Sequence, residues 1–123
     1  MQSLKASPYT NVLVDVYLFE EAWDEAIVVA DQTADWDYSL IDKVVDAVLP
    51  FRPDWVIQAS RKQAEGLIVK TQSKYYAIAE NWLAKMKNAY LASDRKPEWL
   101  TYLEDLKITN SRQPTLQAEL RKL

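Results

Sequence analysis

Glycine is almost absent from this chain, since Gly66 is the only glycine in 123 residues. Two-residue β-hairpin turns need residues with positive φ, which glycine adopts most readily. The phosphate-binding loops of nucleotide-binding α/β proteins need several glycines at fixed spacing. We therefore expect few β-hairpins and no such loop, and the chain must fold through elements that use little glycine.

Apolar residues recur at helical spacing along nearly the whole chain. The clearest stripe covers residues 39–49, where apolar side chains fall at i, i+1, i+4, i+5, i+8 and i+9. Pro50 follows this stripe and ends it, and Pro53 can occupy the first turn of the next helix. The sequence predicts seven helices, at about residues 9–20, 22–33, 39–49, 53–70, 73–92, 97–108 and 114–122.

Short connections between these helices favour antiparallel neighbours, so we expect an all-α domain of helical hairpins over residues 1–123. The first helix is apolar on almost every side, and we expect it to be deeply buried. Gly66 falls inside a predicted helix, where glycine costs about 1 kcal/mol relative to alanine. We interpret it as a close helix crossing, and we interpret Ser73 as the N-cap of the fifth helix.

The chain contains no cysteine and no histidine, which removes most of the usual catalytic chemistry. Disulfides, thiolate nucleophiles, cysteine zinc sites and histidine acid–base catalysis are excluded. A carboxylate segment, Asp31 with Asp35 and Asp37, lacks the central glycine and distal glutamate of a calcium loop, and we interpret it as a solvated turn. We expect no cofactor, no metal and no enzymatic activity, and an enzyme acting through carboxylates or tyrosine alone is the least favoured alternative.

Charge divides the chain into two halves. Residues 1–54 contain 11 Asp and Glu against 3 Lys and Arg, a net charge of −8, whereas residues 55–123 contain 7 against 12, a net charge of +5. Cations interleaved with aromatic residues are the types that neutralise phosphates and stack on bases. They can equally face an acidic surface of a protein partner or of a second copy. The candidate partner-binding residues of this half are Arg61, Lys62, Lys85, Lys87, Arg95 and Lys96.

Trp36 is the other candidate partner-binding residue, because it lies in the polar segment of residues 34–37. An aromatic residue exposed in a loop can anchor a partner, and the alternative is that Trp36 folds back onto the core. The remaining tryptophans lie on apolar stripes or at helix starts, and we expect them to fill the spaces between helices. They are Trp23, Trp55, Trp82 and Trp99.

Several short motifs resemble those of tetratricopeptide-like proteins. Tyr17-Leu18 followed by Trp23-Asp24-Glu25-Ala26-Ile27 resembles the turn and second helix of a tetratricopeptide unit, and Tyr76 repeats the Tyr-x-x-Ala spacing. More specifically, the chain resembles the helical region that follows SWIM zinc fingers in bacterial and cyanobacterial proteins. The features that match this region are Trp23-Asp24-Glu25-Ala26, Arg52-Pro53-Asp54-Trp55, Tyr76-x-x-Ala79-x-x-Trp82-Leu83 and Glu98-Trp99-x-x-Tyr102-Leu103.

The resemblance implies a right-handed, tetratricopeptide-like stack of hairpins that belongs to a larger protein, and it carries no catalytic or ligand residue. We expect a non-enzymatic protein–protein interaction or scaffolding module, whose partner is a protein, a peptide, another domain of the same polypeptide or a second copy. The alternative is a nucleic-acid-associated regulatory domain that uses the basic half. No apolar run reaches the ~20 residues of a membrane span and the start lacks a signal-peptide pattern. We therefore expect a cytoplasmic location without a membrane partner.

Overall fold

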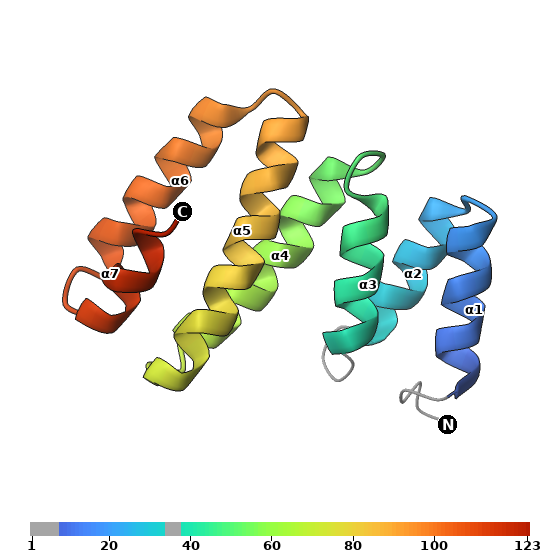
Figure 1. Ribbon diagram of the computed structural model, residues 1–123, viewed down its shortest axis with the longest axis horizontal. Helices are drawn as coiled ribbons and strands as arrows, with labels where there is room; N and C mark the ends of the chain where they lie inside the picture. The colour runs from blue at the N-terminus through green and yellow to red at the C-terminus, as the bar shows by residue number, and fades with distance from the viewer. Residues whose placement is uncertain (1–7, 34–37) are drawn as a thin grey trace. The chain divides into compact units, whose positions relative to one another are not determined.

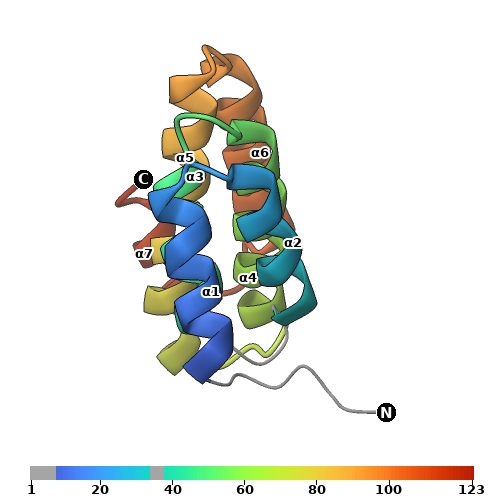
Figure 2. The same ribbon diagram turned by 90° about the vertical axis from the view of Figure 1, so that its right-hand side faces the viewer.

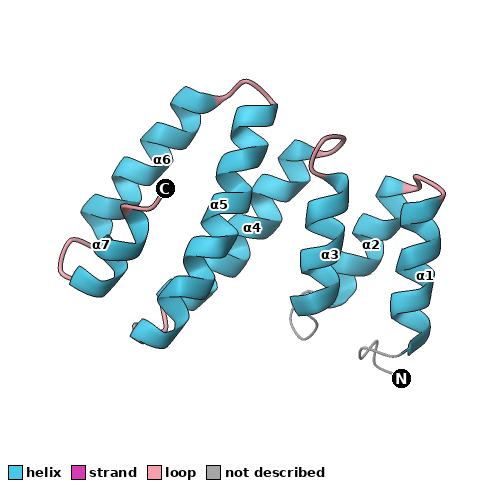
Figure 3. Ribbon diagram, viewed as in Figure 1, coloured by secondary structure: helices cyan, strands magenta, loops and turns pink. Residues whose placement is uncertain are grey.

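The computed structural model of the chain describes residues 8–33 and 38–123, and these ranges are helical apart from short turns (Figures 1 and 3). Seven α-helices and one 3-10 helix lie in the described ranges, which contain no strand, so the all-α prediction is confirmed. Every predicted helix is present to within about two residues at most ends. The helices are α1 (Pro8–Phe19), α2 (Trp23–Thr33), α3 (Tyr38–Val48), α4 (Pro53–Ile68), η1 (Ser73–Tyr75), α5 (Tyr76–Ala92), α6 (Lys96–Thr109) and α7 (Pro114–Leu120).

The chain folds as two compact units, an N-terminal unit of Met1–Arg52 and a C-terminal unit of Pro53–Leu123. The boundary lies two residues before the point where the charge of the sequence changes sign. The N-terminal unit has 10 Asp and Glu against 3 Lys and Arg, a net charge of −7, and the C-terminal unit has 8 against 12, a net charge of +4. The expectation of one domain over the whole chain stays a prediction.

In the N-terminal unit, α1 and α2 form a helical hairpin, and both pack against α3 (Figure 1). The apolar stripe that predicted α3 is the centre of this packing, because its aliphatic side chains are almost completely buried. Two small residues of α2, Ala26 and Ala30, are also completely buried, and small side chains allow close approach of packed helices. The buried residues of α3 are Leu40, Ile41, Val44, Val45 and Val48.

The prediction that the first helix is deeply buried is wrong. Among the α1 residues whose burial is described, only Val14 is buried, while 58% of Val12, 45% of Val16 and 89% of Phe19 are exposed. The helix packs on α2 and α3 from one side, so an apolar sequence on all sides leaves its outer face uncovered. Apolar residues on all sides of α1 therefore did not mean that all sides of the helix are buried.

In the C-terminal unit, α4 and α5 form a long antiparallel hairpin, and α6 and α7 pack on α5 (Figure 1). Figure 2 shows α4 and α6 on one side of this unit and α5 and α7 on the other. The core combines aliphatic and aromatic side chains, with Trp99 as its largest fully buried member. Its other fully buried large residues are Val56, Leu83, Met86, Leu116 and Leu120.

Two helices end in the same way, although neither end contains glycine. Glu21 after α1 and Asp94 after α5 have φ values of 59° and 60°. The next residue in each turn donates its N–H back five residues, from Ala22 to Tyr17 and from Arg95 to Tyr90, both at 2.8 Å. This is the Schellman arrangement, which is most often built with glycine at the left-handed position. It reverses the chain into α2 and α6.

Two interpretations based on single residues are wrong. Gly66 lies in α4 with an ordinary helical φ, and a Cβ added there would meet nothing within 4 Å, so it is not at a close helix crossing. Ser73 does not cap α5, because the 3-10 turn η1 begins at Ser73 and Tyr75 occupies the N-cap position without a side-chain hydrogen bond. The tight turn supplies the chain reversal that a cap would otherwise organise.

The tryptophans divide into two groups. Trp82 and Trp99 are buried, as expected, whereas Trp23 and Trp55 are only half-buried. Trp23 stacks on Phe51, with ring centroids 4.5 Å apart and planes 10° from parallel.

Across residues 8–33 and 38–123, no helix combines the length and the apolar character needed to cross a membrane.

Candidate functional site

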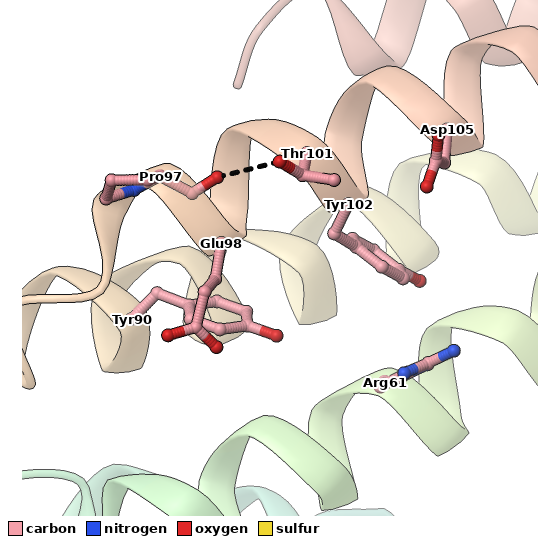
Figure 4. A pocket seen from close by; sticks show the side chains of 7 residues that line it. All are labelled: Arg61, Tyr90, Pro97, Glu98, Thr101, Tyr102 and Asp105. Carbon is pink, nitrogen blue, oxygen red and sulfur yellow. Dashed lines mark hydrogen bonds between the residues drawn. The ribbon is translucent and has the colours of Figure 1, made fainter.

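An open depression on the C-terminal unit, with a volume of about 490 Å³, is lined by residues of α4, α5 and α6 (Figure 4). We call it the α4–α6 depression. Arg61 comes from α4 and Tyr90 from α5, and the remaining lining residues lie on two successive turns of α6. Those of α6 are Pro97, Glu98, Thr101, Tyr102 and Asp105.

Aromatic residues form its inner wall. Trp99 is 1% exposed and lies between two tyrosines, with ring centroids 6.3 Å from Tyr90 and 6.1 Å from Tyr102. Both pairs are tilted, at distances typical of favourable aromatic contacts. Because Trp99 is locked in the core, it fixes the positions of the two tyrosine rings that face the depression.

One edge of the depression is a three-residue hydrogen-bonded group. The Tyr102 hydroxyl donates to Glu65 Oε2 at 2.6 Å, and Arg61 Nε donates to the same oxygen at 3.0 Å. The Arg61 guanidinium also lies over the Tyr102 ring, 5.2 Å from its centroid. Burial and the hydrogen bond to Glu65 raise the pKa of the Tyr102 hydroxyl above its ordinary value, so this group is a hydrogen-bond donor at physiological pH.

A second group of charged residues lies at the turn between α5 and α6. Arg95 donates one guanidinium N–H to Asp54 at the start of α4 and another, from Nε, to Glu98 Oε2 at 3.2 Å. Its guanidinium lies 5.2 Å from the centroid of the Tyr90 ring. The hydrogen bond to Asp54 raises the pKa of Arg95, and the group ties the first turns of α4 and α6 to the turn that joins α5 and α6.

The outer wall of the depression is polar and exposed. Thr101 Oγ1 donates to the Pro97 carbonyl at 3.0 Å, which leaves the hydroxyl oxygen able to accept a hydrogen bond. Asp105 is exposed and makes no ion pair with any residue in the described ranges. Figure 4 shows Tyr102 and Asp105 extending from α6 on the side that faces Arg61 of α4.

The structure brings together two of the predicted partner-binding residues, Arg61 and Arg95, each stacked on a tyrosine of the depression. Lys62 and Lys96 are exposed but do not line it. Lys85 lies over the Trp82 ring at 5.9 Å, and Lys87 donates to the Leu123 carbonyl at 2.8 Å. Of the predicted basic residues, Arg61 lines the depression and the others do not.

Trp36, the remaining predicted binding residue, lies outside the described residues, as do Asp35 and Asp37. Their interpretation stays a prediction.

Sequence reasoning missed the polar residues of the depression, because it treated α6 only through its apolar positions. The missed residues share one face of α6 at helical spacing, next to a stripe of buried residues that includes Trp99 and Leu103. The sequence signal that could have found this face is the pair Thr101 and Tyr102 with a carboxylate before and after it at helical spacing, Glu98 and Asp105. The missed residues are Glu98, Thr101, Tyr102 and Asp105.

Comparisons with known proteins give no family for this chain. No protein-family model matches it. No curated protein and no solved structure shows a significant match either.

Proposed function

We propose that this chain is a non-enzymatic protein–protein interaction module whose α4–α6 depression receives a peptide segment of a partner. The observation that carries the proposal is the fixed geometry of the site. Arg61 and Tyr102 share the Glu65 carboxylate, Glu98 accepts from Arg95, and Trp99 packs against both tyrosines. A surface fixed before binding loses little conformational entropy on binding. An open site lined by tyrosine, arginine and polar groups is also the composition of protein-binding surfaces.

The layering of the C-terminal unit supports a tetratricopeptide-like architecture, which is part of the same proposal. Helices α4 and α6 occupy one layer and α5 and α7 the other (Figure 2). In helical-repeat proteins, surfaces formed by neighbouring helices of one layer receive peptides. The depression occupies the corresponding position between α4 and α6.

Nucleic-acid binding through the basic half is the alternative, and the arrangement of cations favours it less. Arg61 is paired with Glu65, and Arg95 with Asp54 and Glu98, so a phosphate would have to compete with carboxylates already in place. Lys62 and Lys96 follow Arg61 and Arg95 in the sequence, but neither lysine lines the depression. Binding of single-stranded nucleic acid through counterion release would weaken steeply with added salt.

A randomised peptide library displayed against the whole chain tests the proposal. We expect the wild-type chain to enrich a convergent set of peptides, and Thr101→Trp to lose them, because the indole fills the open depression. Leu100→Trp is the matched control, since Leu100 is the preceding residue, is 51% exposed and does not line the depression.

The outcomes separate the two functions. Peptides that bind wild type and Leu100→Trp but not Thr101→Trp support the depression as the binding site. Equal binding by all three chains, or no enrichment at all, contradicts the proposal. Salt-sensitive binding of an oligonucleotide that Thr101→Trp leaves intact would favour the nucleic-acid alternative.

A further inference from the structure

We infer that the α4–α6 depression selects a peptide segment carrying a cationic side chain, lysine or arginine, whose charged end pairs with Asp105. This inference rests on the proposed function, because it names the chemistry of the segment that the same depression receives. It reverses one interpretation of the sequence, in which the basic half faces an acidic surface of a protein partner or of a second copy.

Negative charge exceeds positive charge around the depression. The depression and the two ion-paired groups to which its lining residues belong contain two arginines, Arg61 and Arg95, and four carboxylates. The site is therefore acidic by two charges, although the C-terminal unit as a whole has a net charge of +4. Complementary local charge orients a partner even where the overall charge of the protein is opposite. The carboxylates are Asp54, Glu65, Glu98 and Asp105.

The charged groups at the depression differ in whether they already have an ion-pair partner. Both arginines pair with carboxylates, so their positive charge is already offset by negative charge beside it. Asp105, in contrast, lines the depression and has no ion-pair partner among the described residues. The charged group that lines the depression without an ion-pair partner among the described residues is therefore a carboxylate.

The shape of a cationic side chain also suits the depression. Lysine and arginine have long apolar stems that lie along apolar surfaces while their charged ends reach polar groups. Tyr102 and Pro97 supply apolar surface in the depression, and Thr101 and Asp105 supply acceptor oxygens on the same helix (Figure 4). A side chain lying along α6 would meet both.

Three small probes with blocked ends test the inference by titration of the ¹⁵N-labelled whole chain. They are the N-acetyl methylamides of lysine, glutamate and norleucine. We expect the lysine probe to shift the backbone amide signals of residues 101–105, with a dissociation constant in the millimolar range. We expect the glutamate probe to leave these signals unchanged, and the norleucine probe to shift them more weakly than the lysine probe.

Substitutions then assign the charge. Asp105→Asn should weaken binding of the lysine probe roughly tenfold, because it removes the charge and keeps the shape of the side chain. Glu104→Gln is the matched control, since Glu104 is the neighbouring exposed carboxylate of α6 and does not line the depression. We expect it to leave the affinity within about twofold of wild type, with the change carried only by long-range charge.

Specific results overturn the inference. A glutamate probe that binds as well as the lysine probe, a lysine probe that shifts no signal of residues 101–105, or equal affinities for wild type and Asp105→Asn would each contradict it. The proposed function fails on a different result, namely peptide binding that Thr101→Trp does not affect. If the α4–α6 depression binds uncharged peptides, the proposed function is supported and only this inference is contradicted.

Discussion

The two units use charged residues in different ways. In the N-terminal unit, cations pair one to one with exposed carboxylates, Lys43 with Asp15 at 2.7 Å and Arg52 with Asp24 at 2.9 Å. Such pairs are screened by water and add little to stability. The hydrogen bond and charge of Arg52 lower the pKa of the Asp24 carboxyl. The further bonds of these cations go to uncharged oxygens, from Arg52 to the Phe51 carbonyl at 2.9 Å and from Lys43 to Asn11 Oδ1 at 3.4 Å.

In the C-terminal unit the same residue types form groups that share partners. Glu65 accepts from both Arg61 and Tyr102, and Arg95 donates to both Asp54 and Glu98. Groups linked in this way restrict one another's rotamers, so they hold a surface in one arrangement. The comparison teaches that the acidic unit has the larger net charge, whereas the basic unit has the more organised polar surface.

The largest expected difference between the units concerns two aromatic side chains. Trp99→Ala in the C-terminal unit should lower the free energy of unfolding by about 3–5 kcal/mol, because the side chain is 1% exposed and packs between two tyrosines. Phe19→Ala in the N-terminal unit should lower it by less than about 0.5 kcal/mol, because Phe19 is 89% exposed. Urea unfolding followed by circular dichroism measures both.

A loss of several kcal/mol in Phe19→Ala would break this comparison. It would show that the exposed apolar face of α1 is covered in solution, and the loss would then depend on protein concentration if a second copy covers it.

A smaller effect tests the shared hydrogen bonds of the C-terminal unit. Tyr102→Phe removes the hydroxyl that donates to Glu65 and should lower the free energy of unfolding by about 1 kcal/mol. This is less than for a buried bond to a charged group, because the site is partly exposed. Tyr75→Phe is the control, since the Tyr75 hydroxyl makes no hydrogen bond with the described residues. Equal losses in the two variants would contradict the role assigned to the Tyr102 hydroxyl.

The smallest effects compare the two left-handed turns. Glu21→Gly and Asp94→Gly should each raise the melting temperature, with a gain in stability of about 0.5–1 kcal/mol, because glycine adopts positive φ without strain. The gain should be larger for Glu21→Gly, since aspartate tolerates this conformation better than glutamate. Glu20→Gly, at a position without positive φ, should give no gain, and a gain there would point to another cause.

Helix positions were the most predictable feature of this protein. Proline placement and apolar spacing gave the helices closely, because both act within a few residues of the chain. Burial was less predictable for α1, since its apolar residues could be interpreted as core only by assuming neighbours on every side. The surroundings of Gly66 were also not predictable, because a glycine lowers helix stability whether or not another helix approaches it.

The candidate site was predictable only in part, through Arg61 and Arg95. Their positive charge is visible in the sequence, but its neutralisation by Glu65, Asp54 and Glu98 depends on helices that are far apart along the chain or on rotamers within one helix. Asp105 was missed because the sequence does not show which carboxylates remain unpaired. A site that is defined by an unpaired charge can be predicted only when the positions of all the charged groups around it are known.

The sequence by itself determined that this protein is helical, where its helices begin and end, and which catalytic chemistries it lacks, because these depend on residue types and on contacts between near neighbours in the chain. Only the tertiary structure decided which apolar faces are covered and which charges are paired. It placed an acidic depression on a basic unit, because local electrostatics follow distances between side chains, and those distances are set by the packing of α4, α5 and α6.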